Sequence, residues 1–161
     1  MTKAHIAWRI GTTTMTCTAD DLSGAGAAQN PGRWNASNQF VVYAAPTIAM
    51  SVLETAAHLR SGSLPLDRHV VRIAIPAGVW RARERVPVSR LPVGWDAMPA
   101  SMIAAQFGAK WYDARRGAIL EVPSAIVPEE TILVINAMHP DAGKLQADAV
   151  RRSEFERLFR R

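Results

Sequence analysis

The chain has 161 residues, of which 48% are hydrophobic and 20% are charged, and its formal net charge is +5 at pH 7. This length is typical of one domain with its own core, and the single cysteine, Cys17, excludes an intramolecular disulfide and any metal site built from several cysteines. No apolar run approaches the roughly 20 residues of a membrane span, and the first residues lack the plan of a signal peptide. We therefore expect a cytoplasmic protein that does not enter a membrane.

The first half of the chain predicts strands around a long loop. Trp8–Ile10 is a candidate strand, and residues 11–32 are rich in Gly, Thr, Ala and Asp with no helical or strand period, which predicts a loop. Loops of this length are usually functional or disordered. Phe40–Ala45 is a short β-branched and aromatic run that ends at a proline, as strands often do. A helix is predicted over Pro46–Arg60, because proline is tolerated in a first helical turn.

The second half mixes the two kinds of element. Strands are predicted at Val70–Ile75, Ala118–Val122 and Ile132–Ile135, and helices at Pro99–Arg116, with Gly117 as its C-cap, and at Lys144–Phe159. Strands and helices do not alternate regularly, which favours an α+β fold, a compact domain of mixed β-sheets with flanking helices. We expect one domain over residues 1–161, with a motif-bearing core of about 8–141 and a C-terminal helix over 144–159.

The excess of basic charge lies in two arginine clusters. Three of the 19 Lys and Arg residues are lysines, and the arginines gather between Arg68 and Arg90 and again over Arg151–Arg161. Such clusters form a solvated surface, a patch for an acidic partner protein, or a nucleic-acid surface. No helix-turn-helix, zinc-finger or RNA-binding aromatic pattern accompanies them, which leaves nucleic acid the least favoured of the three. We expect surface and partner contacts.

The predicted helix that begins at Pro46 has an unusual polar face. Its polar residues share one face by their spacing: Thr47, Ser51, Glu54, Thr55 and His58. Ile48, Val52, Ala56 and Leu59 line the other. A face with one acid and no cation is either a sparsely charged surface or the wall of a cleft, and the spacing fits both. Glu54 and His58 also stand at i and i+4, where a simple local contact would account for His58.

Several phrases, each weak alone, occur in an informative order. They are Gly32-Arg33-Trp34-Asn35, Val41-Val42-Tyr43 leading through Leu53-Glu54, Val122-Pro123-Ser124-Ala125, Pro128-Glu129 and Asn136-Ala137-Met138-His139-Pro140-Asp141. From about Trp8 to Asp141 the chain resembles the RES-domain proteins, the toxins of Xre–RES toxin–antitoxin modules. Two details depart from the family pattern. Ala36-Ser37-Asn38-Gln39 lacks the usual glycine after the first phrase, and the aromatic usual before the last phrase is missing.

The resemblance implies a fold related to ADP-ribosyltransferases, with a cleft for NAD+ as substrate and no metal. Members of the family break the nicotinamide–ribose bond, and the ADP-ribose passes to phosphate, to water or to a protein. The residues implied to be catalytic are Glu54, Arg33 and Ser124. Those implied to contact NAD+ are Arg9, Arg33, Trp34, Tyr43 and Ser124. An Xre-type helix-turn-helix antitoxin would cover the active site in a hetero-oligomer, and DNA would be contacted only through that antitoxin.

These residue types suit that chemistry. Loss of nicotinamide leaves an oxocarbenium-like centre, as in glycoside hydrolysis, and nicotinamide departs neutral, so that one carboxylate suffices without a general acid. Guanidinium groups bind the oxygens of a diphosphate in pairs. Each residue also has a structural interpretation: a surface acid for Glu54, salt bridges for the arginines, core packing for Trp34 and Tyr43, and a turn cap for Ser124.

Two other functions remain open on the residues alone. The first is a module that binds NAD+ or a related nucleotide without turnover. The second is a basic protein that binds nucleic acid, whose affinity would fall steeply with salt.

Overall fold

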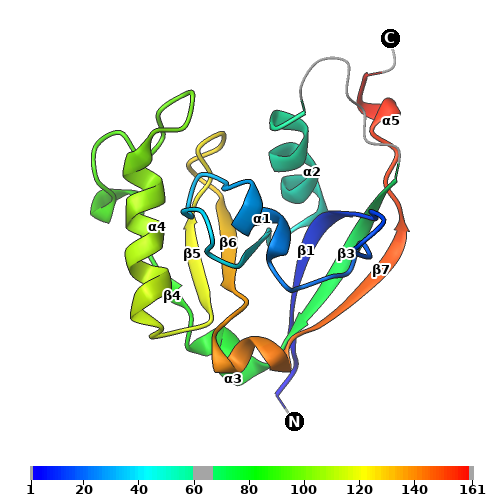
Figure 1. Cartoon of the computed structure of the whole chain (residues 1–161), viewed down its shortest axis with the longest axis horizontal. Helices are drawn as coiled ribbons and strands as arrows, with labels where there is room; N and C mark the ends of the chain where they lie inside the picture. The colour runs from blue at the N-terminus through cyan, green and yellow to red at the C-terminus, as the bar shows by residue number, and fades with distance from the viewer. Residues whose placement is uncertain (1, 60–66, 160–161) are drawn as a thin grey trace.

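Two β-sheets organise the structure, a computed structural model that describes residues 2–59 and 67–159 (Figure 1). The first sheet has the order β1-β3-β7, and all its pairs are antiparallel. Its strands are β1 (His5–Thr12), β3 (Arg68–Ile75) and β7 (Gln146–Arg152). The central strand, β3, is buried on both faces, since Val70, Val71, Ile73 and Ile75 have no exposed surface.

The second sheet has the order β2-β6-β5-β4, in which only the short β4 pairs parallel to its neighbour. Its strands are β2 (Val41–Ala44), β6 (Thr131–Asn136), β5 (Ile119–Pro123) and β4 (Glu84–Arg85). In residues 2–59 and 67–159, one isolated β-bridge joins the two sheets. The Trp8 N–H donates to the Ala45 carbonyl at 2.8 Å, and the Ala45 N–H donates to the Trp8 carbonyl at 2.7 Å.

The helices lie around these sheets. They are α1 (Ala25–Gln29), α2 (Ile48–Ala57), α3 (Ala77–Arg81), α4 (Met102–Ala114) and α5 (Glu156–Phe159), with 3₁₀ turns η1 at Val88–Arg90 and η2 at Pro140–Lys144. Figure 1 shows α4 alongside the second sheet and α2 between the two sheets. Within residues 2–59 and 67–159, no helix has the length and apolar character to cross a membrane.

Three apolar clusters form the core. The first packs β3 against β5 and β6, through residues such as Ile73, Ile119 and Leu133. The second lies under α4 and holds Trp34, Trp95 and Trp111 together with Leu120 and Val134. The third holds α2 against β1 and β3 through Ile48, Val52, Ala56 and Leu59, the apolar face expected from the sequence. Each large apolar side chain removed from water stabilises the fold by about 1.5–3 kcal/mol.

The α+β fold and the five predicted strands are confirmed, with strand ends moved by up to three residues. The predicted helix over Lys144–Phe159 is wrong, because residues 146–152 form β7 and only 156–159 are helical. The buried strand β3 carries backbone N–H and C=O groups on both edges, and β1 satisfies only one edge. Pairing with β7 satisfies the other, which outweighs the weak helical pattern of that segment.

Residues 11–32 are less irregular than predicted, since β1 continues to Thr12 and α1 forms within them. The sequence also did not predict α3, β4 or the turn η1. The helix predicted over Pro99–Arg116 exists as α4, but its left-handed C-cap is Arg115, with φ 51°, and not Gly117. The helix predicted to begin at Pro46 starts after Thr47, whose hydroxyl accepts the Met50 N–H at 3.1 Å.

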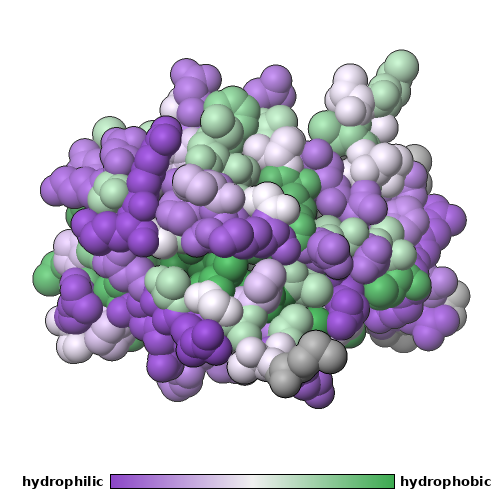
Figure 2. All heavy atoms as spheres, turned by 90° about the horizontal axis from the view of Figure 1, so that it is seen from below, coloured by the Kyte–Doolittle hydropathy of each residue, from purple (hydrophilic) through white to green (hydrophobic). Residues whose placement is uncertain are grey.

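The first arginine cluster is partly structural. Arg83 donates from Nε to the Glu121 carboxylate at 2.6 Å and stacks on Trp80, with 3.8 Å between the guanidinium carbon and the ring centroid. Arg85 Nε lies 3.3 Å from the same carboxylate. The expectation of a free surface is therefore wrong for Arg83, whose side chain is 15% exposed. Figure 2 shows hydrophilic residues over most of the lower face and hydrophobic ones near its middle.

Helix α4 packs directly on the backbone at Trp34, which makes Gly108→Ala a sharp test of the fold. A Cβ at Gly108 would lie 1.7 Å from the Trp34 carbonyl oxygen. We expect the substitution to lower the free energy of unfolding by about 1–3 kcal/mol, because overpacking outweighs the better helix propensity of alanine. Urea denaturation measures the change. Gly78→Ala is the control, since its Cβ meets nothing within 4 Å in α3, and it should stabilise by about 0.5–1 kcal/mol. Equal stability of Gly108→Ala and the native protein would contradict this packing.

Candidate functional site

Glu54 and Ser124, far apart in sequence, are joined by a short hydrogen bond. Ser124 lies in the turn that follows β5, is completely buried, and donates from Oγ to Glu54 Oε1 at 2.5 Å. Its Oγ also accepts the N–H groups of Ile126 and Val127, both at 3.1 Å. Ser124 therefore caps its turn and orients the half-buried carboxylate of Glu54 on α2.

The polar face of α2 is mostly used by the helix itself. Thr47 caps the first turn, Ser51 donates from Oγ to the Ile48 carbonyl at 2.8 Å, and Thr55 donates from Oγ1 to the Ser51 carbonyl at 2.7 Å. Ser51 is buried. Because Ser51 is buried and Glu54 contacts Ser124, this face of α2 is turned toward the protein and is not a plain solvent face.

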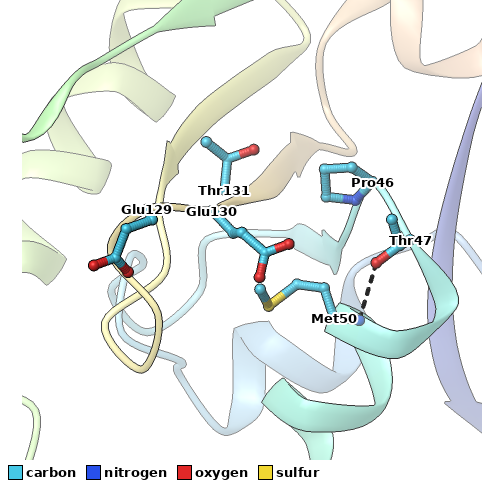
Figure 3. A pocket seen from close by; sticks show the side chains of 6 residues that line it. All are labelled: Pro46, Thr47, Met50, Glu129, Glu130 and Thr131. Carbon is cyan, nitrogen blue, oxygen red and sulfur yellow. Dashed lines mark hydrogen bonds between the residues drawn. The ribbon is translucent and has the colours of Figure 1, made fainter.

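A shallow pocket opens between α2 and the connection from β5 to β6, and neither Glu54 nor Ser124 is among its lining residues (Figure 3). The start of α2 forms one wall and the connection between β5 and β6 forms the other; the lining residues are Pro46, Thr47, Met50, Glu129, Glu130 and Thr131. The Glu130 carbonyl accepts the Ser124 N–H at 2.9 Å, so the pocket shares its second wall with the Ser124 turn.

Arg33 lies in the loop before β2, and its guanidinium is held by a second loop. Its Nη1 donates to the carbonyls of Trp95 and Ala97 at 3.0 and 2.9 Å, and its Nη2 lies 3.0 Å from the Met98 sulfur. These contacts engage three of the five N–H groups of the guanidinium. Within the described parts of the chain, the N–H at Nε and one N–H at Nη2 have no hydrogen-bond partner.

Tyr43 on β2 points back to the Arg33 loop. Its hydroxyl donates to Asn35 Oδ1 at 2.7 Å and accepts the Trp34 N–H at 3.0 Å. Burial raises the pKa of the Tyr43 hydroxyl far above its ordinary value, while the Trp34 N–H and the charge of Arg33 oppose that rise. The hydroxyl therefore stays protonated, and its hydrogen is used in the hydrogen bond to Asn35 Oδ1.

The Trp34 side chain belongs to the core. It is 1% exposed and packs against Trp95 and Phe107, with ring centroids 6.0 and 6.1 Å away. Its backbone N–H, and not its indole, takes part in the Arg33 loop.

Arg9 lies on a different face of the structure from α2. Side chains alternate along a strand, and the neighbours Trp8 and Ile10 pack with the cluster that holds α2. Arg9 donates from Nη1 to the Asp21 carbonyl at 2.9 Å, and its buried Nε has no hydrogen-bond partner. Burial lowers the pKa of its guanidinium, and the nearby Asp21 carboxylate opposes this shift.

The predicted site residues therefore form two groups on one apolar support. Tyr43 and Val127 both pack against the second cluster, which links the Arg33–Tyr43 group to the Glu54–Ser124 group. No hydrogen bond among the described residues joins Arg9 to either group. Asn35 belongs to the Gly-Arg-Trp-Asn phrase, and in the sequence only its place near Arg33 indicates a role for it. In the described parts of the chain, no group of three His, Cys, Asp or Glu residues is placed to hold a metal ion.

Comparison with known proteins relates this arrangement to named relatives. The chain is 50% identical over 145 residues, 90% of each chain, to a Sphingobium protein (strain YBL2) named "Prs ADP-ribosylating toxin". It is 32% identical over 133 residues, 83% of each chain, to a protein of Photorhabdus laumondii named "Toxin Res". A "Toxin Res" of Pseudomonas putida (strain KT2440) is 33% identical over 80% of this chain and 87% of its own.

A solved structure shares the fold. It is the toxin–antitoxin complex MbcT–MbcA of M. tuberculosis, which matches 92% of this chain and 85% of the other with a TM-score of 0.61 and 18% sequence identity. Residues 6–157, nearly the whole chain, match the RES domain. Taken together with the relatives that are at least 30% identical, this match shows that the chain belongs to the RES domain family.

Proposed function

We propose that this chain is the toxin of a toxin–antitoxin module that breaks the nicotinamide–ribose bond of NAD+ and transfers the ADP-ribose to a protein. The contact between Glu54 and Ser124 carries the proposal, because it joins the two residues to which the resemblance assigns the family's Glu and Ser. The name of the 50% identical relative supports the ADP-ribosyl transfer and favours a protein acceptor over water or phosphate.

Glu54 is the proposed catalytic carboxylate. As the bond between the ribose carbon and nicotinamide breaks, its electron pair leaves with neutral nicotinamide and positive charge develops on the ribose. The Glu54 carboxylate stabilises that charge, and Ser124 orients it beforehand by holding Oε1. The acceptor then bonds to the same ribose carbon and loses a proton.

The arginines are the proposed contacts to the diphosphate. Arg33 offers the N–H groups at Nε and Nη2 that the loop carbonyls leave unused, and those carbonyls fix the direction of the guanidinium. Arg9 has a buried Nε–H without an acceptor, which an oxygen of the dinucleotide would supply. Because Arg9 faces away from α2, it would meet a different part of NAD+ from the part beside Glu54.

The rest of the site follows from these assignments. The ring of the partly exposed Tyr43 is the proposed surface for nicotinamide. Its hydroxyl is not part of that surface, since it already donates its hydrogen bond to Asn35 Oδ1. We leave Trp34 out of the contacts because its indole is buried in the core.

We also propose that an antitoxin covers this site in the cytoplasm. The MbcT structure was solved with its antitoxin, which supports a protein partner of that kind. An Xre-type helix-turn-helix antitoxin would bring any DNA contact, as the sequence resemblance implies. The described structure provides one further reason against direct DNA binding, since Arg83 and Arg85 are already paired with Glu121.

Glu54→Gln tests the reaction. The glutamine keeps an oxygen that can accept from Ser124, so the fold should persist while the charge is lost. We expect nicotinamide release from NAD+ to fall by roughly 100-fold or more, as when one stabilising group of an active site is removed. Liquid chromatography of released nicotinamide measures the rate. Asp113→Asn, which removes an exposed acid on α4 outside the candidate site, should keep most of the activity. Full activity in Glu54→Gln would refute the assignment.

Ser124→Ala tests the orientation of that carboxylate. Two backbone N–H groups lose their acceptor and Glu54 loses its donor, so we expect the free energy of unfolding to fall by about 1–3 kcal/mol. Nicotinamide release should fall as well, but less than in Glu54→Gln. Thr14→Ala is the matched control, because the Thr14 hydroxyl also accepts two backbone N–H groups but lies in an exposed turn. A Ser124→Ala variant with native stability and native rate would show that the contact has no role.

The acceptor is tested with NAD+ labelled in the adenine nucleotide and with purified Prs, the protein in the relative's name. We expect the label on Prs with the native chain and none with Glu54→Gln. Mass spectrometry of Prs and chromatography of the small molecules measure where the label goes. Label recovered only as free ADP-ribose would favour water as the acceptor, and label in a phosphate adduct would favour phosphate; either result would overturn the protein acceptor.

A further inference from the structure

The backbone on both sides of Arg33 is held by two side chains that are bonded to each other. The Gly32 N–H donates to Asn35 Oδ1 at 2.8 Å, and the Trp34 N–H donates to the Tyr43 hydroxyl at 3.0 Å. The Tyr43 hydroxyl in turn donates to Asn35 Oδ1 at 2.7 Å. This closed set of hydrogen bonds encloses Arg33, so the position of the Arg33 backbone depends on Asn35 and Tyr43 together.

The amide of Asn35 is fully used. The residue is 1% exposed, and its Oδ1 accepts from Gly32 and Tyr43, which fills both lone pairs. Its two Nδ2 hydrogens point to the Ala27 and Ala36 carbonyls at 2.9 and 3.0 Å, and the Gln39 carbonyl lies 3.4 Å from the same nitrogen as a weaker, shared acceptor. A buried amide with partners at every position specifies one loop conformation, because any other conformation leaves polar groups unsatisfied.

Tyr43 contributes its ring as well as its hydroxyl. The ring lies so close to Gly32 that a Cβ at position 32 would be 2.7 Å from the Tyr43 ring carbon Cζ. Glycine is therefore required beside Arg33 by the close approach of the ring. The contact of the ring with Gly32 limits how closely the loop can approach β2. The hydrogen bond from the Trp34 N–H to the hydroxyl fixes which residue of the loop lies over Tyr43.

The guanidinium of Arg33 extends from this fixed backbone to a second loop. It reaches the carbonyls of Trp95 and Ala97, and Trp95 packs against Trp34 within the core. With both its backbone and its Nη1 fixed, Arg33 has one direction in which its remaining N–H groups can point. A shift of the loop by even a fraction of a hydrogen-bond length would misdirect them.

We infer that Asn35 and the Tyr43 hydroxyl are positioning residues that aim Arg33 at the diphosphate of NAD+, and that neither donates a hydrogen bond to the substrate. This inference rests on the proposed function, since it assigns the diphosphate to Arg33. The inference assigns a specific role to Asn35. It also distinguishes the role of the Tyr43 ring, which is proposed to contact nicotinamide, from that of the hydroxyl, which positions Arg33.

Kinetics of Tyr43→Phe and Asn35→Ala, alone and combined with Arg33→Ala, test the inference. Each single variant should raise KM for NAD+ by roughly tenfold with little change in kcat, because binding to the diphosphate is lost equally in the ground and transition states. In the Arg33→Ala background neither change should raise KM further, since the group that they aim is gone. Multiplicative effects in the double variants would overturn the inference.

The fold provides matched controls for both substitutions. The Tyr112 hydroxyl also accepts a backbone N–H, that of Phe40 at 3.2 Å, and Asn136 is likewise a buried asparagine with backbone partners. Tyr112→Phe and Asn136→Ala should lower the thermal midpoint without raising KM. A rise in KM equal to that of Tyr43→Phe and Asn35→Ala would mean that any loss of packing weakens the site, which would contradict a specific role.

A second measurement does not depend on turnover of NAD+. Backbone hydrogen exchange of the 27–39 peptide should speed up by roughly tenfold or more in Tyr43→Phe and Asn35→Ala, while exchange in β5 and β6 stays as in the native protein. Unchanged exchange at 27–39 would refute the loop restraint even if NAD+ is consumed. Faster exchange in the two variants, together with a native chain that releases no nicotinamide, would support the restraint and place the failure in the proposed function.

Discussion

The arrangement of this molecule depends on two backbone hydrogen bonds, those between Trp8 and Ala45. They join the edge of the first sheet to the end of β2 in the second. Pro46 and the helix cap Thr47 follow at once, so the bridge also determines where α2 begins. A helix that starts at the junction of two sheets has both sheets to pack against. Its apolar face meets β1 and β3 in the third cluster, and Met50 enters the second cluster.

This placement explains how Glu54 meets Ser124. Strand β5 of the second sheet ends at Pro123, and the turn that follows puts Ser124 against the polar face of α2. Each residue also has an ordinary structural task, since Ser124 caps its turn and α2 holds the sheets together. The position of the Glu54 carboxylate is therefore fixed by α2, which packs on β1 and β3, and by the Ser124 turn, which has its own backbone hydrogen bonds. A preorganised charge of this kind is what stabilisation of a cationic transition state requires.

The Gly-Arg-Trp-Asn phrase shows how four neighbouring residues divide one task. Gly32 admits the Tyr43 ring, Trp34 anchors the loop in the core, and Asn35 satisfies the surrounding backbone. Arg33 is the residue whose side chain leaves the loop to meet another segment. The arginines elsewhere have different tasks. Arg83 is a structural partner of Glu121 in the second sheet, and Arg9 is a partly buried residue of β1 in the first. A net charge counts these arginines equally and cannot distinguish them.

The amino-acid sequence by itself determined the α+β class, the five strand positions and the apolar face of α2, because these depend on local composition and period. Through its resemblance to the RES family, the sequence also predicted Glu54, Ser124 and Arg33 as one set, and the structure brings the first two into contact. Only the tertiary structure decided that residues 146–152 are a strand, that the Trp34 indole is buried and that Arg9 lies on another face. These outcomes depend on contacts between segments that are distant in the sequence. The backbone groups on the second edge of β3 need hydrogen-bond partners, and β7 supplies them. The Trp34 indole fills the space between α4 and the second sheet. Successive side chains of β1 point to opposite faces of the sheet, which separates Arg9 from Trp8 and Ile10.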